Sequence, residues 1–587
     1  MSPTLGVFFM VGANKHHETA GRRRRTHSRR RFLRIAGATG VVGTIGAVGG
    51  AGSASAREAA TVAQPEGEPV PELVYENLDP DAPLRFWYGE QHANRLREVG
   101  FDVDYNTRAL DAHLERVFTT RDFDYTVMRW LDGFDPDRAL RDIASEGTLE
   151  EGGGNVPGFV DEEYEEMLAE QRSTVDEASR QEIVFEMQEF MVDDHVIHPI
   201  VVQDRAMPFR TDRVSNVSGM LEDGLAGIWN MVQIETEDGE LSAASHEDLT
   251  NLDPVTGLVT RANRDMITLV YDRLMHVDPD EDFLPVPWAA EAVEWDGDEA
   301  LDIVLREGAE WHDGEPVTAD DVAFSFEYHD EHNPDFAGLA ENVDSVEAET
   351  DLDVRIELLQ PDAIMETRVL AGRFASLIPQ HVWEGREPDD IVAEQDYVGS
   401  GPFQFEEMSL GEDLRLSAHE GHHHEPNVDE FIRVETADPS GTASVVEGGA
   451  VDMANFDLPA DQLTALEGDP DIELESALMT SIHYGVPNRR REPFAHPAVR
   501  EATAHTIPRE EIVEIGADGF AEVIVAPLSP GLEFWYNEDV TEFPYDLERA
   551  EQVLADAGFE WDEDGNLFYP PDYELQEEWP DPHEPPE

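Results

Sequence analysis

Residues 311–328, WHDGEPVTADDVAFSFEY, constrain the fold more than any other stretch of the 587-residue chain. Asp313-Gly314 predicts a turn, and Pro316 keeps the backbone before it extended. Thr318 stands at an N-cap position with Asp321 three residues later, which is the spacing of a capping box. The apolar residues that follow have helical spacing: Ala319, Val322, Ala323 and Phe326. The stretch therefore predicts an extended segment, a turn and a capped helix packed on a core.

Acidic residues far outnumber basic ones, since 129 Asp and Glu against 40 Lys and Arg give a formal net charge of −89. The hydrophobic fraction of 40% argues against disorder, so we expect a folded protein of two or three lobes with a carboxylate-covered surface. Lys15 is the only lysine. This composition resembles that of proteins from salt-in halophiles, in which molar salt screens repulsion between carboxylates. No nucleic-acid partner is expected, because phosphate requires a basic patch.

The first 56 residues have the composition of a targeting segment. Residues 28–34, SRRRFLR, follow the twin-arginine export pattern, and Ala54-Ser55-Ala56 offers a cleavage site. A basic arm that binds nucleic acid is the alternative interpretation. The chain has no cysteine, which excludes disulfides and a lipid-modified N-terminal cysteine. We expect an extracytoplasmic protein, secreted or at the cell surface, and an uncleaved leader would anchor it.

The 311–328 stretch resembles a hallmark of the extracellular solute-binding proteins of the dipeptide/oligopeptide/nickel family, family 5 of the binding proteins of ABC importers. The usual form of this hallmark is F-x-D-G-x-P-x-T-A-x-D-V-x-(F/Y)-S. Other segments between residues 252 and 571 resemble the family in its usual order: LDP at 252–254, GSGPF at 399–403, VVEGGAVD at 445–452 and PFAHPAVREA at 493–502.

Residues 83–235, in contrast, resemble the C-terminal part of the same family. They contain a strand ending in RWLDGFDPD at 129–137, a long helix at 177–193 and an RTDRV turn at 210–214. Joining residues 236–571 to 83–235 restores one family member, so we infer a circular permutation. A fusion of two truncated genes is the alternative.

The resemblance implies an α/β fold of the type II periplasmic-binding-protein class, with two lobes, an extra subdomain and permuted order. Residues 84–88, LRFWY, are expected to form a strand, with a short helix after it. The expected segments are a twin-arginine leader (1–56), a flexible linker (57–82), second-lobe segments (83–205 and 480–571), first-lobe segments (206–275 and 390–479), the extra subdomain (276–389) and an acidic tail (572–587).

The loop after the strand at 123–130 is the main candidate for ligand binding. The resemblance implies that Trp130 packs beside the ligand and that Asp132 or Asp135 receives the α-ammonium of a peptide. A solvated acidic loop is the alternative. The resemblance also implies weaker ligand contacts for Tyr484 and Asn488, and backbone pairing of Gly257 and Leu258 with an extended peptide.

Catalytic and metal-binding motifs give little support for other classes of function. Carboxylate pairs occur by chance in so acidic a chain, and no P-loop, G-x-S-x-G or cysteine nucleophile is present. His419, His422–His424 and Glu425 offer imidazoles for Zn²⁺ or Ni²⁺, but three adjacent histidines do not readily face one ion, so no metal site is expected.

These observations predict a monomeric binding protein with no cofactor and no enzymatic activity. It would capture a short peptide, or a similar small solute, by hinge closure and deliver it to an ABC permease. A sensor or scaffold with the same fold is one alternative, and a surface hydrolase that uses carboxylates is another.

Overall fold

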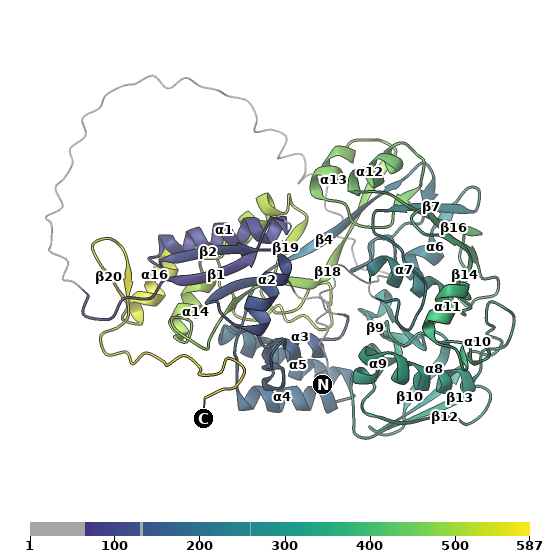
Figure 1. Ribbon diagram of the computed structural model, residues 1–587, viewed down its shortest axis with the longest axis horizontal. Coiled ribbons are helices and arrows are strands. Elements are labelled where there is room, and N and C mark those ends of the chain that lie inside the picture. The colour runs from purple at the N-terminus through teal and green to yellow at the C-terminus, as the bar shows by residue number, and fades with distance from the viewer. Residues whose placement is uncertain (1–64, 81, 130–132, 259, 587) are drawn as a thin grey trace, which may run out of the picture.

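The computed structural model describes residues 65–80, 82–129, 133–258 and 260–586. Two α/β lobes share one 11-stranded sheet, whose main path runs β14-β15-β16-β7-β17-β4-β18-β3-β1-β2, with β19 paired to β4. Two long strands, β4 (His198–Arg210) and β18 (Ile472–Pro487), run from one lobe into the other (Figure 1). This arrangement confirms the predicted two-lobed fold of the type II binding-protein class.

The crossing strands β4 and β18 pair antiparallel along most of their length, from Ile472 opposite Arg210 to Gly485 opposite His198. The register is interrupted between Leu478 and Ile482, where the sheet passes from the first lobe to the second. A local break in the ladder of hydrogen bonds bends and twists a strand pair. A second register shift follows between His483 and Tyr484. The two lobes are therefore joined by a hydrogen-bonded ribbon, and we call its first interruption, at Leu478–Ile482, the irregular point of β18.

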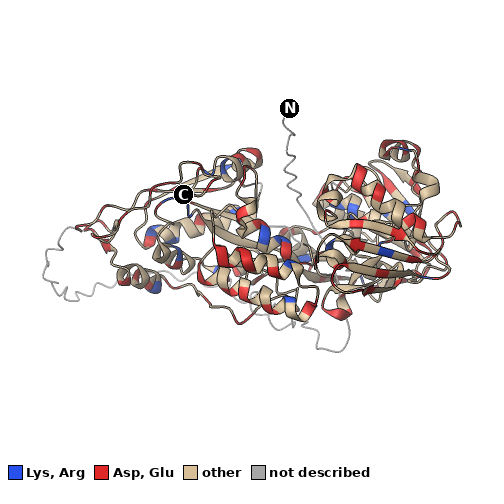
Figure 2. Ribbon diagram, turned by 90° about the horizontal axis from the view of Figure 1, so that it is seen from below, with Lys and Arg blue, Asp and Glu red and all other residues tan. Residues whose placement is uncertain are grey.

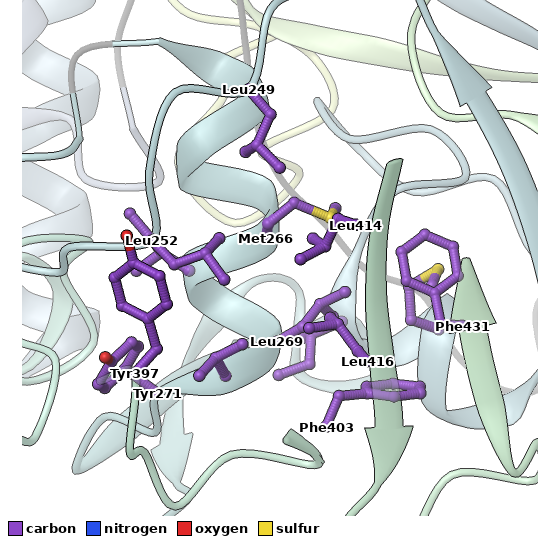
Figure 3. Packing of buried hydrophobic residues seen from close by; sticks show 14 of the residues in the cluster. Leu249, Leu252, Met266, Leu269, Tyr271, Tyr397, Phe403, Leu414, Leu416 and Phe431 are labelled. Atoms are coloured by element: carbon purple, nitrogen blue, oxygen red, sulfur yellow. The ribbon is translucent and has the colours of Figure 1, made fainter. Parts of the chain in front are cut away.

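The first lobe is built around helix α7 (Arg261–Val270), which packs against the sheet. Met266 and Leu269 of α7 face Leu414, Leu416 and other apolar side chains of the sheet (Figure 3). The other elements of this lobe are β7 (Glu240–Ser245), β14 (Phe403–Ser409), β15 (Asp413–Ala418), β16 (Glu430–Glu435), β17 (Met453–Ala454), α6 (Ile228–Gln233), α10 (Gln380–Trp383), α11 (Pro388–Glu394), α12 (Pro439–Glu447) and α13 (Ala460–Leu466).

The second lobe combines two distant parts of the sequence. Its strands are β1 (Leu73–Leu78), β2 (Val103–Arg108), β3 (Tyr125–Arg129) and β19 (Ala521–Val523), with β1 parallel to both β2 and β3. Its helices include α1 (Pro83–Glu98), α2 (Leu110–Leu114), α3 (Asp137–Ala144), α4 (Glu162–Ser173), α5 (Glu177–Asp193), α14 (Pro497–Ala504), α15 (Arg509–Glu511) and α16 (Leu547–Asp556).

Two predictions about the start of this lobe are wrong. The expected strand at 84–88 is the first part of helix α1, in which Pro83 occupies the first turn and Tyr88, Ala93 and Leu96 form one buried face. The strand lies earlier, at β1, inside the segment 57–82 that was expected to be a flexible linker. Leu73 and Tyr75 are fully buried between neighbouring strands, and this burial outweighs the polar composition around them.

Residues 65–235 do not form a separate globule. Leu73 and Leu96 share one apolar core with Val499 and Leu554, and Leu84 and Leu547 pack against the same core. In addition, β3 pairs with β18 from Tyr125 opposite Pro487 to Arg129 opposite His483. The N-terminal part of the chain therefore completes a lobe whose other half comes from the C-terminal part.

The extra subdomain contains the stretch with which the sequence analysis began. Thr318 caps helix α8 (Ala319–His332), and its backbone N–H donates to Asp321 Oδ2 at 2.9 Å, as the capping box predicts. The helix packs on an antiparallel four-stranded sheet, with a core that runs from Leu274 to Leu377. The remaining elements are β10 (Ala290–Trp295), β11 (Ala300–Leu305), β12 (Val343–Ala348), β13 (Asp353–Leu358), α9 (Pro334–Leu339) and the π-helical turn η5 (Met365–Leu370).

Short two-stranded pairings complete the fold: β5 (Val214–Ser215) with β6 (Glu235–Thr236), β8 (Met275–Asp278) with β9 (Leu284–Pro287), and β20 (Glu560–Trp561) with β21 (Leu567–Phe568). The acidic tail after residue 571 packs on the second lobe. Nε2 of His583 lies 2.8 Å from the carbonyl oxygen of Thr119. The backbone N–H of Trp579 donates to the carbonyl oxygen of Arg490.

Asp and Glu residues, red in Figure 2, are distributed over both lobes. This distribution fits the expected carboxylate-covered surface. Among the described residues, no helix has the length and apolar character needed to cross a membrane. The leader predicted at 1–56 lies outside the described residues.

Candidate functional site

Five charged side chains meet where the crossing strands pass between the lobes, and we call them the interlobe ionic cluster: Arg129, Arg205, Glu222, Arg261 and Asp457. They come from the end of β3, from β4, from the loop before α6, from the first residue of α7 and from the loop after β17. Arg205, Glu222 and Arg261 are each at most 1% exposed. Charges are buried only where partners compensate them, so this concentration marks a specialised place in the fold.

Glu222 links the cluster to the irregular point of β18. Its Oε2 accepts hydrogen bonds from the backbone N–H of Thr480 at 2.6 Å and from the hydroxyl of Thr480 at 3.0 Å. Its other oxygen, Oε1, lies 3.7 Å from Arg205 Nη2. Glu222 has a positive φ of 71°, a conformation that non-glycine residues rarely adopt. The surrounding contacts hold this loop in a conformation that aims the carboxylate at the crossing strands.

Asp457 joins the two buried arginines of the first lobe. Its Oδ1 accepts from Arg261 Nη1 at 3.0 Å and lies 3.7 Å from Arg205 Nε. The side chain of Asp457 is 35% exposed, so it connects the buried charges to solvent. The guanidinium of Arg261 also lies 4.7 Å from the ring centre of Phe456, a cation–π contact.

Arg129 brings the second lobe into the cluster. Its Nε donates to the hydroxyl of Ser481 at 3.0 Å, and Nη2 lies 3.3 Å from the sulfur of Met479. Burial lowers the pKa of Arg129 to about 10, although the carboxylates of Glu222 and Asp457 act in the opposite direction. Arg129 remains a cation at neutral pH, held directly before the loop that contains Trp130.

Glu247 adds a titratable group to the first-lobe side of this region. Its Oε2 accepts from the backbone N–H of Ala262 at 3.0 Å, in the first turn of α7. Burial raises the pKa of Glu247 to about 7, with Asp265 adding to the effect. A carboxyl group near α7 therefore changes its charge close to neutral pH.

None of the predicted ligand contacts that the structure describes is a member of this cluster. Trp130 and Asp132 lie outside the described residues. Tyr484 is 2% exposed and belongs to the apolar core of the second lobe. Asn488 is buried beyond the end of β18, where its side-chain amide donates to the carbonyl oxygens of Arg121 and Phe123.

Asp135 lies in a different ionic network, between the second lobe and the extra subdomain. Both of its oxygens accept from Arg180, each at 2.8 Å, and Oδ2 also accepts from the hydroxyl of Thr367 at 2.6 Å. The strong ion pair with Arg180 holds the pKa of Asp135 at about 2, although burial alone would raise it. Its carboxylate thus serves a contact between parts of the protein.

Gly257 and Leu258 lie in the loop that leads into α7. The side chain of Asn263 donates to the carbonyl oxygen of Gly257 at 2.7 Å, and Leu258 packs in the first-lobe core. A Cβ on residue 257 would come within 2.1 Å of Asn251 Oδ1, so a side chain does not fit there. The loop is fixed close in sequence to Arg261 of the cluster.

The histidine-rich loop at 419–424 packs on aromatic side chains. The ring of His424 stacks on Trp288 at 4.3 Å between centroids, and His422 Nε2 lies 3.2 Å from Asp272 Oδ1. Burial lowers the pKa of His423 to about 3 and that of His424 to about 4. The described part of the chain contains no group of three or more His, Cys, Asp or Glu side chains placed to hold a metal ion.

None of the five members of the cluster is among the ligand contacts predicted from the sequence. Arg205 gives a signal, since a charged residue interrupts the strand pattern at 198–210, but Glu222 and Asp457 are two of 129 acidic residues. Only the folding of three distant segments onto one another distinguishes these carboxylates from surface ones.

Comparisons with known proteins identify relatives of the chain. The chain is 28% identical over 323 residues to the oligopeptide-binding protein AppA of Bacillus subtilis, covering 52% of this chain and 58% of that protein. It is 26% identical to the dipeptide-binding protein of Escherichia coli, covering 44% of this chain and 51% of that protein. The chain therefore spans about half the length of the curated relatives that it matches.

A solved structure, that of Bacillus subtilis AppA in complex with a nonapeptide, is 24% identical with a TM-score of 0.41, and the match covers 57% of this chain and 66% of AppA. A family model described as bacterial extracellular solute-binding proteins, family 5 Middle, matches residues 285–580, half of the chain. The chain belongs to the family 5 extracellular solute-binding proteins.

Proposed function

We propose that the protein captures a short peptide, or a similar small solute that carries both a positive and a negative group, outside the cytoplasm. It then delivers this solute to an ABC permease. The observation that carries this proposal is the interlobe ionic cluster, in which cations and carboxylates of both lobes meet at the crossing strands. The relatives named as oligopeptide- and dipeptide-binding proteins support a peptide as the solute. The protein acts by binding and lobe closure, without turnover of the solute.

The partly exposed members of the cluster offer partners for both ends of a peptide. Arg129, at intermediate exposure, presents a guanidinium group for a carboxylate, and Asp457 presents an oxygen for an ammonium. The partial exposure of Asp457 gives a solute access to the cluster. Trp130 and Asp132 directly follow Arg129 in sequence, so we retain both as proposed ligand contacts.

We also propose that the chain is a circular permutant of its family. The backbone N–H of Tyr569 donates to the carbonyl oxygen of Glu68 at 2.9 Å, and that of Val70 donates to the carbonyl oxygen of Leu567 at 2.9 Å. Residues near 571 and residues near 66 therefore lie side by side. A direct connection there, with an opening near residue 236, gives the usual family order, and adjacent surface ends make such a rearrangement inexpensive.

The leader and the composition extend the proposal to the place where the protein acts. The SRRRFLR motif at 28–34 supports twin-arginine export, and the net charge of −89 with a single lysine supports function in molar salt. Under those conditions the surface carboxylates are screened and the lobes retain their fold.

Titration of the mature protein with di- to pentapeptides in molar salt tests the binding function, with tryptophan fluorescence and calorimetry as readouts. We expect saturable binding without product. Asp457→Asn should weaken affinity by about tenfold, the effect of a charge-assisted hydrogen bond. Asp302→Asn, an exposed aspartate paired with Arg355 on the extra subdomain, is the control. Accumulation of cleaved peptide, or equal affinity of the two variants, contradicts the proposal.

A further inference from the structure

A cavity of about 450 Å³ lies where β18 ends and the C-terminal tail crosses the second lobe. It shares no lining residue with the interlobe ionic cluster. Three arginines line it, Arg121, Arg490 and Arg491, together with Trp579 and Pro582 of the tail. Such a grouping is unusual in a chain with 40 basic and 129 acidic residues, so the charges at this cavity need a separate account.

Arg121 carries an uncompensated charge at the cavity wall. The residue is 2% exposed, and its guanidinium donates to the carbonyl oxygens of Val117 at 2.9 Å and Gly153 at 2.8 Å. Its Nε is buried and has no hydrogen-bond partner. Burial lowers the pKa of Arg121 to about 10. A buried donor that lacks an acceptor is costly, so the charge of Arg121 is incompletely compensated in the folded protein.

Arg490 likewise has no carboxylate partner, although each of its nitrogens donates a hydrogen bond. It donates to the carbonyl oxygens of Val156 at 2.7 Å, Asn155 at 2.9 Å and Pro582 at 2.7 Å, and its guanidinium lies 5.3 Å from the ring centre of Trp579. Within the described residues, no carboxylate lies within 4.0 Å of a nitrogen of Arg121 or Arg490. Burial, together with the charge of Arg121, lowers the pKa of Arg490 well below its usual value. Two guanidiniums thus repel each other in one buried place.

The acidic residues at the cavity already have other partners. Arg491 forms ion pairs with Asp124 at 2.7 Å and with Glu578 at 3.2 Å. Asp122 forms an ion pair with Arg116 at 2.7 Å. These three carboxylates pair with Arg491 and Arg116, and none of them pairs with Arg121 or Arg490. The four guanidiniums exceed the three carboxylates by one positive charge, which an anion that enters the cavity would balance.

We propose that this cavity is a binding site for a small anion that carries a carboxylate or a tetrahedral oxoanion group. Guanidinium groups bind both kinds of oxygen anion in the same geometry. The indole of Trp579 and the ring of Pro582 give the site an apolar wall, formed by the tail. The site is separate from the one proposed for solute capture, so either can exist without the other.

Calorimetric titration of the full mature chain with malonate and with sulfate, at constant ionic strength set by NaCl, tests this proposal. We expect saturable binding of one anion per chain. Arg121→Gln should weaken this binding by about tenfold or more, and Glu578→Gln should strengthen it, because it removes a negative charge from the cavity wall. The opposite signs separate a local charge effect from general loss of stability.

Arg355→Gln is the matched control, since it removes an arginine from the extra subdomain that already has three acidic partners. Its anion affinity should equal that of the unmodified protein. Binding of malonate alone identifies a carboxylate ligand, and binding of sulfate alone identifies an oxoanion ligand. The proposal is overturned if neither anion binds saturably, or if Arg121→Gln and Arg355→Gln bind equally well.

Discussion

Glu366 shows how one side chain responds to the contact between the extra subdomain and the second lobe. Its Oε1 accepts from the indole N–H of Trp295 at 2.5 Å, and the carboxylate of Glu177 from α5 adds repulsion. Burial is the main cause that raises the pKa of Glu366 to about 7. The folded protein therefore holds a proton at Glu366 between the ordinary carboxyl pKa and pH 7, where the unfolded chain has released it.

Because the folded state binds the extra proton, the free energy of unfolding falls as the pH rises through this window. Glu366→Gln keeps an acceptor for Trp295 and cannot ionise. We therefore expect the free energy of unfolding of this variant, minus that of the unmodified protein, to be about 2 kcal/mol larger at pH 8 than at pH 5. Denaturant unfolding at both pH values in molar salt measures the difference. Glu347→Gln, an exposed change on β12, should show no such pH dependence, and an equal response of both variants would rule this account out.

Sequence patterns predicted the residues that obey local rules. Thr318 and Asp321 form the expected capping box because both partners lie within one helical turn. The prediction of a strand at residues 84–88 was wrong, because an aromatic run fits a strand or a buried helical face equally well. The partners of Glu222, Arg205 at β4 and Thr480 at β18, are fixed only by the pairing of distant strands, so no local pattern announces them.

At the scale of elements, an ion pair joins helix α4 to the segment before η5. Arg172 donates to both oxygens of Asp362, at 2.8 and 2.9 Å, and Asn342 donates to Asp362 Oδ2 at 2.7 Å. Asp362 is fully buried, and its carboxylate raises the pKa of Arg172 in spite of partial burial. Loss of one partner therefore leaves a buried charge without compensation.

Arg172→Met should destabilise the protein by about 3 kcal/mol because it leaves the buried carboxylate of Asp362 without its cationic partner. In the double variant with Asp362→Leu, part of this loss should be recovered, with a coupling energy of about 2 kcal/mol. Chemical denaturation of the two single variants and the double variant completes the cycle. Strictly additive effects would show that the contact between α4 and this segment contributes nothing specific.

At the scale of the whole molecule, chain order is separate from the fold. A rearranged chain that begins at Asp238, runs to 571 and continues from 66 to Glu237 tests the proposed permutation. Residues 237 and 238 are exposed in a turn, and the new junction joins segments that already hydrogen-bond. We expect the same circular dichroism spectrum and unchanged peptide affinity.

A second rearranged chain, opened between Thr480 and Ser481, serves as the control. That cut falls inside β18, which pairs with β3 and β4, so this chain should fail to fold. If the chain opened at 237/238 also fails, the ends are not interchangeable and the permutation proposal is wrong. The circular dichroism readout needs no knowledge of the natural solute.

The irregular point of β18 has a consequence for the connection between the two lobes. The strands β4 and β18 pair on both sides of this point, so the ladder of hydrogen bonds is interrupted there and continues beyond it. At the bend, the backbone N–H of Thr480 bonds to Glu222 in place of a neighbouring strand. Glu222 therefore supplies, from a distant segment of the chain, the hydrogen bonds that the strand ladder lacks at Thr480.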